Sequence, residues 1–337
     1  MKKIFNLIVS FVLLAGFSAC NKDGSDKPGL PPAPVPTVNY KGLTFISSGK
    51  STVCLAKVGA PDEITLEYST DEAQWNPYTL GEKISLADGT FLLFRAGEQK
   101  NLTFSKGSDS YYHFEISGPV TAQGNIMSLL DRYFSTPLST NAFFALFEGC
   151  KSLLSAPELP ATTMAQGCYF RMFAECTGLT SAPELPAEAL AYNCYGRMFK
   201  GCSALTYVPD LPATKMEAYC YNSMFANCTS LKFAPELPAT RLDTGCYHCM
   251  FEGCTSLTSA PELPATELVS NCYEFMYKDC RNLRYVIGLF TTEPSKKTTE
   301  DWLSGVAASG TFIKSEKATW DVTGAHGVPE GWKIETW

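Results

Sequence analysis

The chain has 337 residues, 45% of them hydrophobic and 12% aromatic, so it is long enough to bury at least one sizeable core. Its formal net charge is −7, from 27 basic and 34 acidic residues, and no basic run lies outside the N-terminus. Binding to a nucleic-acid backbone requires clustered Lys and Arg side chains, so the composition argues against a nucleic-acid partner.

The N-terminus has the pattern of an export signal. Lys2 and Lys3 precede the apolar stretch IFNLIVSFVLLAG, which is too short for an ordinary membrane span, and FSAC follows it. This pattern resembles a bacterial lipoprotein signal, whose lipobox ends at the cysteine that receives the lipid. The resemblance implies removal of residues 1–19 and lipidation of Cys20. Because Asn21 follows, and not aspartate, the outer membrane is the expected location; a plain secretory signal is the alternative.

Residues 20–37 are expected to form a lipid-anchored tether. The segment NKDGSDKPGLPPAPVPT contains five prolines and cannot bury apolar surface, so we expect an extended chain. Folded structure should begin near Val38. The tether would hold the folded part away from the bilayer. Both a surface-exposed and a periplasm-facing position are open, with exposure at the cell surface favoured.

Residues 38–135 are expected to form a β-sandwich. Seven short segments alternate apolar and polar residues at a spacing of roughly ten residues, with turn residues between them. They are GLTFISS, TVCLAKV, ITLEYST, KISLAD, TFLLFRAG, NLTFSKG and YYHFEIS. Trp75 and Tyr78 are more simply explained as core or rim residues, but exposed aromatic residues on a sandwich can also bind glycans, and we keep that alternative.

Residues 141–290 contain a strict internal repeat. Two series of cysteines each step by 26 residues without a slip. They are Cys150, Cys176, Cys202, Cys228, Cys254 and Cys280, and Cys168, Cys194, Cys220, Cys246 and Cys272. A constant period of this length is typical of a solenoid, in which one supersecondary unit per repeat stacks on its neighbours.

Each 26-residue coil is predicted to contain one short strand and one short helix. The first half, as in SAPELPAT at 155–162, carries two prolines and should be extended. In the second half Leu268, Cys272, Met276 and Cys280 are four residues apart, a spacing that puts side chains on one stripe of a helix. The predicted fold class is therefore an α/β solenoid that follows an all-β sandwich.

The repeat resembles a known family. The string M-F-x-x-C-x-x-L-x-x-A-P-x-L-P, as in MFAECTGLTSAPELP, is similar to the BspA-like leucine-rich repeats of Bacteroidetes-type surface proteins. The strings LEYSTDEAQWNPYTL, DWLSGVAASGTF and GVPEGWKI are similar to the ends of such lipoproteins. The resemblance implies a leucine-rich-repeat solenoid in a surface lipoprotein that acts in adhesion or protein binding.

The two ends of a solenoid expose its core and need to be covered. The segment NAFFALFEGC at 141–150 is half a repeat and should dock against the sandwich. Residues 291–337 lose the repeat but retain aromatic residues, so we expect them to form a small C-terminal cap.

The 14 cysteines of an exported chain first suggest disulfides. Geometry argues against most of them, because Cys168 and Cys176 would lie about 12 Å apart on a helix, whereas a disulfide needs Cα atoms within about 7 Å. We interpret the two series as buried thiol ladders. Cys246 and Cys249 form one C-x-x-C pair, but no second pair or paired histidine would complete a zinc site, so no metal or cofactor is expected.

A carboxylate also recurs once per repeat. We interpret this column as a solvated acidic stripe, with a calcium-binding column as the alternative. Its members are Glu158, Glu184, Asp210, Glu236 and Glu262. The three histidines fall in three different segments, and no phosphate loop or H-E-x-x-H motif is present, so the sequence supports no catalytic site and we expect a protein that is not an enzyme.

Variation within the fixed repeat points to a binding surface. The two positions before the alanine of A-P-E-L-P hold three aromatic residues, Tyr207, Phe233 and Tyr285, and two basic residues, Lys232 and Arg284. In the family that the repeat resembles, these positions lie on or near the exposed concave sheet, where such residues suit recognition. Packing of the aromatic residues between coils is the alternative.

These observations favour a non-catalytic binding or adhesion module that uses the concave face of the repeats. A protein ligand is favoured over a glycan, and host-derived molecules are among the candidate ligands. In the alternative function the sandwich binds a glycan and the solenoid is a spacer.

Overall fold

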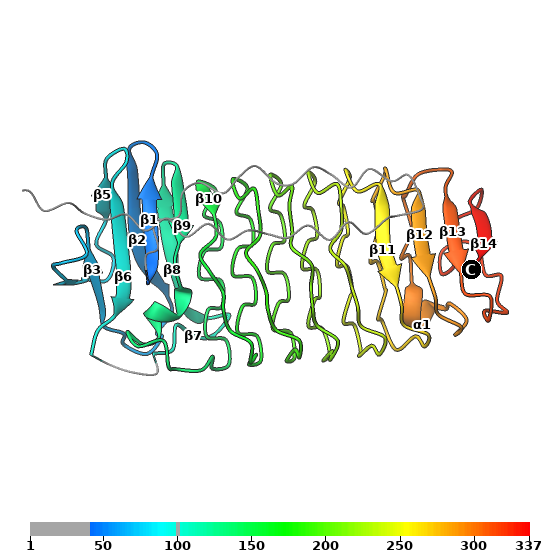
Figure 1. The fold of residues 1–337 in the computed structure, drawn as a ribbon, viewed down its shortest axis with the longest axis horizontal. Coiled ribbons are helices and arrows are strands. Elements are labelled where there is room, and N and C mark those ends of the chain that lie inside the picture. Colours follow the sequence, from blue (N-terminus) through cyan, green and yellow to red (C-terminus); the bar gives the residue numbers. More distant parts are fainter. Residues whose placement is uncertain (1–40, 99–101) are drawn as a thin grey trace, which may run out of the picture. The chain divides into compact units, whose positions relative to one another are not determined.

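The computed structural model describes residues 41–98 and 102–337, which all belong to one unit of the chain (Figure 1). The predicted signal at 1–19, the predicted lipidation site Cys20 and the tether at 20–37 lie outside the described residues.

Two β-sheets pack face to face in the first part of this unit and form a sandwich. The first sheet has the order β10 (Leu153–Ser155), β9 (Val120–Gln123), β1 (Leu43–Ser47), β6 (Phe91–Ala96), β3 (Leu66–Ser69) and β4 (Asn76–Pro77). The second has the order β5 (Ile84–Leu86), β2 (Ser51–Val58), β8 (Ser110–Ser117) and β7 (Ser105–Gly107). Each of the seven predicted strands overlaps an observed strand.

The core between the two sheets is aromatic. The ring centroid of Phe114 on β8 lies 5.0 Å from that of Phe45 on β1 and 5.6 Å from that of Phe94 on β6. All three side chains are buried, as the alternation of apolar and polar residues along these strands requires.

The first repeat stacks directly on the sandwich. β10 pairs in parallel with β9, and on the other side of the coil the Phe114 N–H donates to the Leu146 carbonyl. Phe147 stacks on Phe114 with ring centroids 5.2 Å apart. The prediction that the half-repeat at 141–150 docks against the sandwich is confirmed, and the two cores are continuous.

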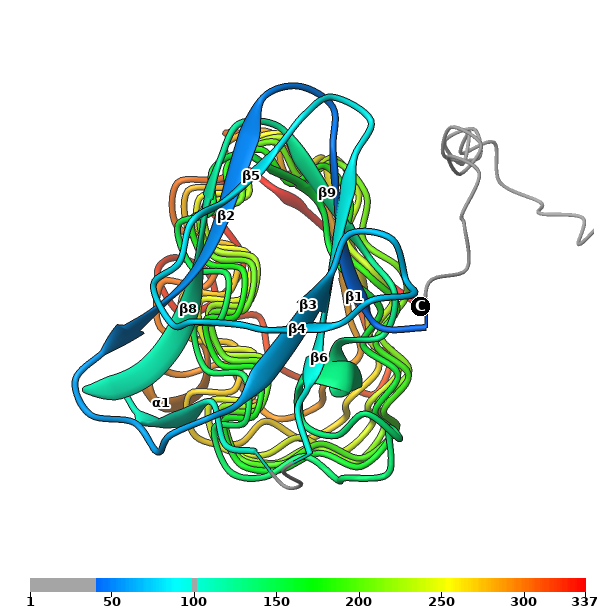
Figure 2. The same ribbon diagram turned by 90° about the vertical axis from the view of Figure 1, so that its left-hand side faces the viewer.

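The repeats form the stacked coils of a β-solenoid, which Figure 2 views end on, so that successive coils overlap. On one side, which we call the strand side, β11 (Ser259–Leu263), β12 (Tyr285–Gly288), β13 (Thr311–Lys314) and β14 (Lys333–Thr336) make a parallel sheet. In earlier coils the strand side is joined by single bridges, as between Ser181 and Tyr207.

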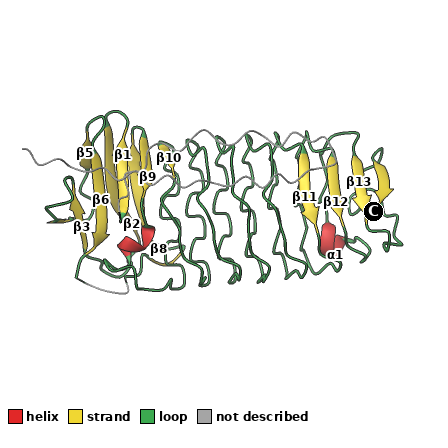
Figure 3. Cartoon of the chain, viewed as in Figure 1, coloured by secondary structure: helices red, strands yellow, loops and turns green. Residues whose placement is uncertain are grey.

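The other side of each coil is a ribbon of turns, and the predicted helices are absent from it (Figure 3). Among the described residues, helical structure is confined to η1 (Ile126–Leu129) and α1 (Lys296–Thr299), both outside the repeats. The prediction of one short helix per coil, and with it the α/β character of the solenoid, is therefore wrong.

Hydrogen bonding and backbone dihedrals explain the error. The Phe170 N–H donates to the Gly167 carbonyl three residues earlier, whereas the next N–H, that of Arg171, donates to Gly196 in the following coil. Every fourth residue is left-handed, as at Gly167 (φ 59°), Arg171 (φ 57°) and Glu175 (φ 60°). Successive four-residue turns thus align side chains at a spacing of four, as a helix does, but half of the N–H groups bond to the neighbouring coil.

Stacked aromatic rings run through the core beside this ribbon. Neighbouring tyrosine rings have centroids 5.8 to 6.0 Å apart, and a second column has centroids 5.3 to 5.6 Å apart. Such pairs add roughly 0.5–1.5 kcal/mol each beyond the burial of their area. The columns are Tyr169, Tyr195, Tyr221, Tyr247 and Tyr273, and Phe147, Phe173, Phe199, Phe225, Phe251 and Tyr277.

Residues 291–337, the predicted cap, follow the path of the coils although their sequence no longer repeats. Tyr285 of β12 pairs with Thr311 of β13, which pairs with Lys333 of β14. Trp302 stacks on Tyr273 with ring centroids 6.1 Å apart, and its indole N–H donates to the Gly327 carbonyl. Tryptophan therefore extends the aromatic column where the repeat sequence ends.

The turn ribbon makes a testable prediction about two equivalent glycines with left-handed backbones, Gly149 (φ 74°) and Gly253 (φ 72°). A Cβ atom at Gly149 would meet no neighbouring atom within 4 Å, whereas a Cβ atom at Gly253 would collide with the side-chain oxygen of Asn227. We expect G149A to lower the free energy of unfolding by about 1–2 kcal/mol through backbone strain alone, and G253A to lower it further. Urea unfolding of both variants checks this, and equal losses would contradict the role of the close approach.

Candidate functional site

The predicted binding residues lie on the outer surface of the strand side. Tyr207, Phe233 and Tyr285 have exposed fractions of 43%, 44% and 38%. They share one position of the 26-residue repeat, and at this position Ser181 pairs with Tyr207, Phe233 with Ser259, and Ser259 with Tyr285. Each of the three aromatic side chains thus keeps a substantial solvent-exposed area.

The two predicted basic residues flank this column. Lys232 precedes Phe233, Arg284 precedes Tyr285, and both side chains are exposed. Within the described residues, neither forms an ion pair. The structure therefore brings all five predicted ligand-binding residues onto one surface, which we call the strand face.

The column of recurring carboxylates lies on the same face. Glu262 pairs in register with Ile287, which is two residues after Tyr285 and points to the same side of β12. The side chains of Glu158, Glu184, Asp210 and Glu236 are exposed, and Glu262 is half-buried. Asp210 accepts a hydrogen bond from the Glu236 N–H at 3.1 Å. No group of three or more metal-ligating side chains in the described part of the chain is arranged to hold a metal ion.

The cysteines of both ladders are buried inside the coils as free thiols. In the first ladder the Cys150 thiol donates to the Phe114 carbonyl of β8, and each later thiol donates to a backbone carbonyl in the preceding coil, for example Cys202 to Phe173 at 3.1 Å. Burial raises the pKa of the thiols, to about 12 at Cys202 and Cys254. Protonated, enclosed thiols are poor nucleophiles, so the ladders act in packing and hydrogen bonding.

Thiol titration tests this arrangement. We expect all 13 cysteines in the described residues to react with a thiol reagent in denaturant at pH 8 without reductant. In the native chain almost none should react, because the thiols are buried and their pKa is raised. Recovery of only a few thiols in denaturant would show that the ladders are disulfide-bonded.

A polar cluster surrounds the C-x-x-C pair on the turn side. His248 Nδ1 accepts a hydrogen bond from Asn222 Nδ2 at 2.7 Å, and His248 Nε2 lies 3.5 Å from a carboxylate oxygen of Glu274. Asn222, His248 and Glu274 are 26 residues apart, one from each of three successive coils. The Cys249 thiol lies 3.8 Å from His248 Nε2. The recurrence of these three polar residues at intervals of 26 is the signal in the sequence that could have revealed this column.

The electrostatics of this cluster do not favour nucleophilic or redox chemistry. Burial, and then the nearby carboxylate of Glu252, raise the pKa of Cys249 to about 12, so the thiol is protonated at neutral pH. Cys246, the other member of the pair, is fully buried in the second ladder.

His248 makes stability depend on pH. Burial lowers its pKa, and the carboxylates of Glu274 and Glu252 oppose this only in part. The folded chain therefore binds this proton more weakly than the unfolded chain, whose histidine pKa is about 6.5. The contribution to stability is complete above that pH and is lost as the pH falls below it.

We predict that the thermal unfolding midpoint of H248Q falls less than that of the wild-type chain between pH 7.5 and pH 5.5. Comparing the two pH dependences removes the contributions of the other titrating groups, because the chains differ only at this residue. Circular dichroism melts provide the measurement, and identical pH dependences would show that His248 is not responsible.

The alternative glycan-binding residues are engaged within the sandwich. The guanidinium carbon of Arg95 lies 3.7 Å from the centroid of the Trp75 ring and covers one of its faces. The Tyr78 hydroxyl accepts from the Leu55 N–H at 2.8 Å and donates to the Glu82 carbonyl at 2.7 Å. Both side chains are half-buried, which agrees with the interpretation as core or rim residues.

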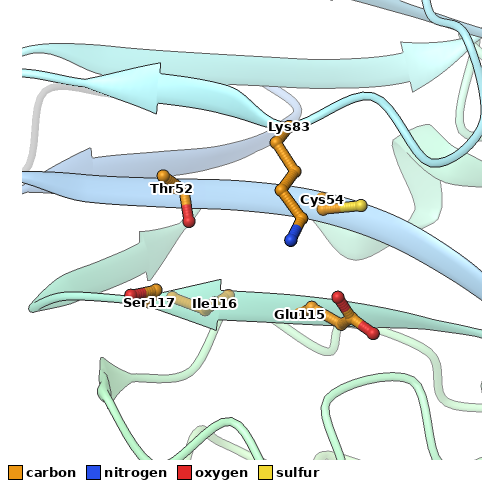
Figure 4. Close-up of a pocket in the computed structure, with 6 residues that line it drawn as sticks. All are labelled: Thr52, Cys54, Lys83, Glu115, Ile116 and Ser117. Atoms are coloured by element: carbon orange, nitrogen blue, oxygen red, sulfur yellow. The ribbon is translucent and has the colours of Figure 1, made fainter.

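A shallow pocket on the sandwich offers little room for a ligand (Figure 4). Its lining combines residues of β2 and β8 with Lys83, whose amine points toward β8 in the figure. Its volume of about 110 Å³ is below the roughly 300–1,000 Å³ of typical small-molecule sites. The strand face is the better candidate.

In the described ranges, no helix has the length and hydrophobicity needed to cross a membrane. In comparisons with known proteins, no family model, no curated protein and no solved structure matches this chain.

Proposed function

We propose that this chain is an outer-membrane lipoprotein that binds a protein ligand, without catalysis, through the strand face of a solenoid related to leucine-rich repeats. The observation that carries the proposal is the exposure of Tyr207, Phe233 and Tyr285 at one register position. Large aromatic side chains are enriched among the residues that dominate protein–protein binding energy.

The other coils strengthen this interpretation. Ser155, Ser181 and Ser259 occupy the same position as the aromatic residues. Serine satisfies the geometry of the coil equally well, so the solenoid does not need an aromatic residue there. Three partly exposed aromatic rings lower solubility, and the geometry of the coil does not require them. Binding of a ligand explains why they are present.

Support for the repeat family is divided. The strand side and the cysteine and leucine positions agree with the BspA-like pattern, and the buried Leu179, Leu205 and Leu231 line the core after each cysteine. The ribbon of turns takes the place of the helices. Location in the outer membrane rests on the resemblance of the N-terminus to a lipoprotein signal, and exposure at the cell surface rests on the resemblance of the repeats to those of surface proteins.

The alternative function, glycan binding by the sandwich, is supported less well. Arg95 already covers one face of Trp75, and the Tyr78 hydroxyl has both a donor and an acceptor within the chain. A sugar platform needs an open aromatic face.

The proposal predicts how binding responds to substitution on the strand face. The full-length wild-type chain and the Y207S/F233S variant would be applied to protein arrays and glycan arrays. We expect protein ligands of the wild-type chain to bind the variant at least about tenfold more weakly, because two anchors are lost. Serine is chosen because it occupies the same position in other coils, so the variant should fold.

The matched control is Y192S, which removes a tyrosine of similar exposure, 46%, outside the strand face. It should bind as the wild-type chain does. Protein binding that is unaffected by Y207S/F233S would contradict the proposal. Glycan binding that is abolished by W75A and unaffected by Y207S/F233S would establish the alternative.

A further inference from the structure

The recurring carboxylates of the strand face carry charge that no basic side chain of the described residues compensates in an ion pair. On the turn side, Glu148 pairs with Arg171. On the strand face, no carboxylate of the recurring column forms an ion pair within the described residues. The strand face therefore carries a row of acids without ion-pair partners in the described part of the chain.

The unpaired carboxylates stand close together. Backbone hydrogen bonds link neighbouring coils, so equivalent residues lie about 4.8 Å apart, and two unit charges at that distance repel by roughly 0.9 kcal/mol in bulk water. Five acids in a row occupy about 19 Å along the stacking direction at this spacing. A positively charged partner would remove this repulsion, whereas an anionic or neutral partner would not.

The aromatic column lies beside the acidic one. Within one coil, Phe233 is followed three residues later by Glu236, and Tyr207 is followed three residues later by Asp210. Rings and carboxylates both attract Lys and Arg side chains, the rings through cation–π contacts and the carboxylates through ion pairs. Lys232 and Arg284 stand on the other side of the aromatic column and would repel a basic partner there.

We propose that the strand face binds an extended, basic segment of a partner protein, laid along the stacked coils over the aromatic and acidic columns. The inference rests on the proposed function and specifies the chemistry of its ligand. Charge complementarity favours a basic polypeptide, because its Lys and Arg side chains would contact the aromatic rings and the carboxylates at once. A neutral glycan could use only the aromatic column.

Two synthetic peptides test this inference on the full-length chain. The basic probe is (Lys-Thr)₄, which spans about 26 Å when extended, and the acidic probe is (Glu-Thr)₄. Fluorescence anisotropy of labelled peptides in low salt measures binding. We expect (Lys-Thr)₄ to bind the wild-type chain and (Glu-Thr)₄ not to bind.

Two triple variants with the same change in net charge separate the face from the overall charge. The variant E184Q/D210N/E236Q neutralises the centre of the acidic column. The variant E188Q/E217Q/E267Q neutralises three exposed acids outside the column. We expect roughly tenfold weaker binding of (Lys-Thr)₄ to the first variant, and a change of less than about twofold in the second. Equally weakened binding of (Lys-Thr)₄ to both variants, or unchanged binding to both, would overturn the inference.

The protein-array ligands of the wild-type chain distinguish failure of this inference from failure of the proposed function. If these ligands are lost in Y207S/F233S but still bind E184Q/D210N/E236Q at full affinity, the face binds protein and its ligand is not basic. If they also bind Y207S/F233S at full affinity, the proposed function itself is wrong. If only glycans bind, and their binding depends on Tyr207 and Phe233, the ligand of the strand face is a neutral glycan and not a basic polypeptide.

Discussion

Backbone hydrogen bonding between successive coils is the constraint on which the rest of the structure depends. On the turn side, alternate N–H groups donate to the next coil, and on the strand side the parallel pairing does the same. Because one coil contains 26 residues, each side chain meets its equivalent in the next coil. This repetition aligns the core rings in stacks, the thiols in ladders and the surface residues in columns.

Sequence reasoning recovered the part of the fold whose signals have one structural meaning. Alternating residues identified the sandwich strands, and a constant period identified the stacked coils. A spacing of four was ambiguous, because helices and chained four-residue turns both align such residues. Glycine and asparagine recur at left-handed positions such as Gly201, Asn227 and Gly253, and they were the available signal against a helix. No repeat in the sequence indicated that the coils continue through Trp302.

The candidate site also has a part that the sequence predicted and a part that it did not. The column of Tyr207, Phe233 and Tyr285 could be read from the repeat, because deviation from a constant frame marks positions that packing does not determine. The contacts of His248 with Asn222 and Glu274 depend on which way side chains turn outside the core, and spacing alone does not give that direction. Within the described residues, the lack of ion pairs along the acidic column likewise depends on where side chains point, which the spacing of the acids does not give.

The way the sandwich joins the first coil has a consequence for how such chains can evolve. Its two sheets continue into the two sides of the coil, so the N-terminal end of the stack is already closed by β8 and β9. A whole repeat can then be duplicated or deleted inside the stack without altering either end. Each duplication would lengthen the exposed face by about 4.8 Å and add one more position at which serine can be exchanged for an aromatic residue. Recognition could thus be lengthened or shortened in fixed steps while the fold stays the same.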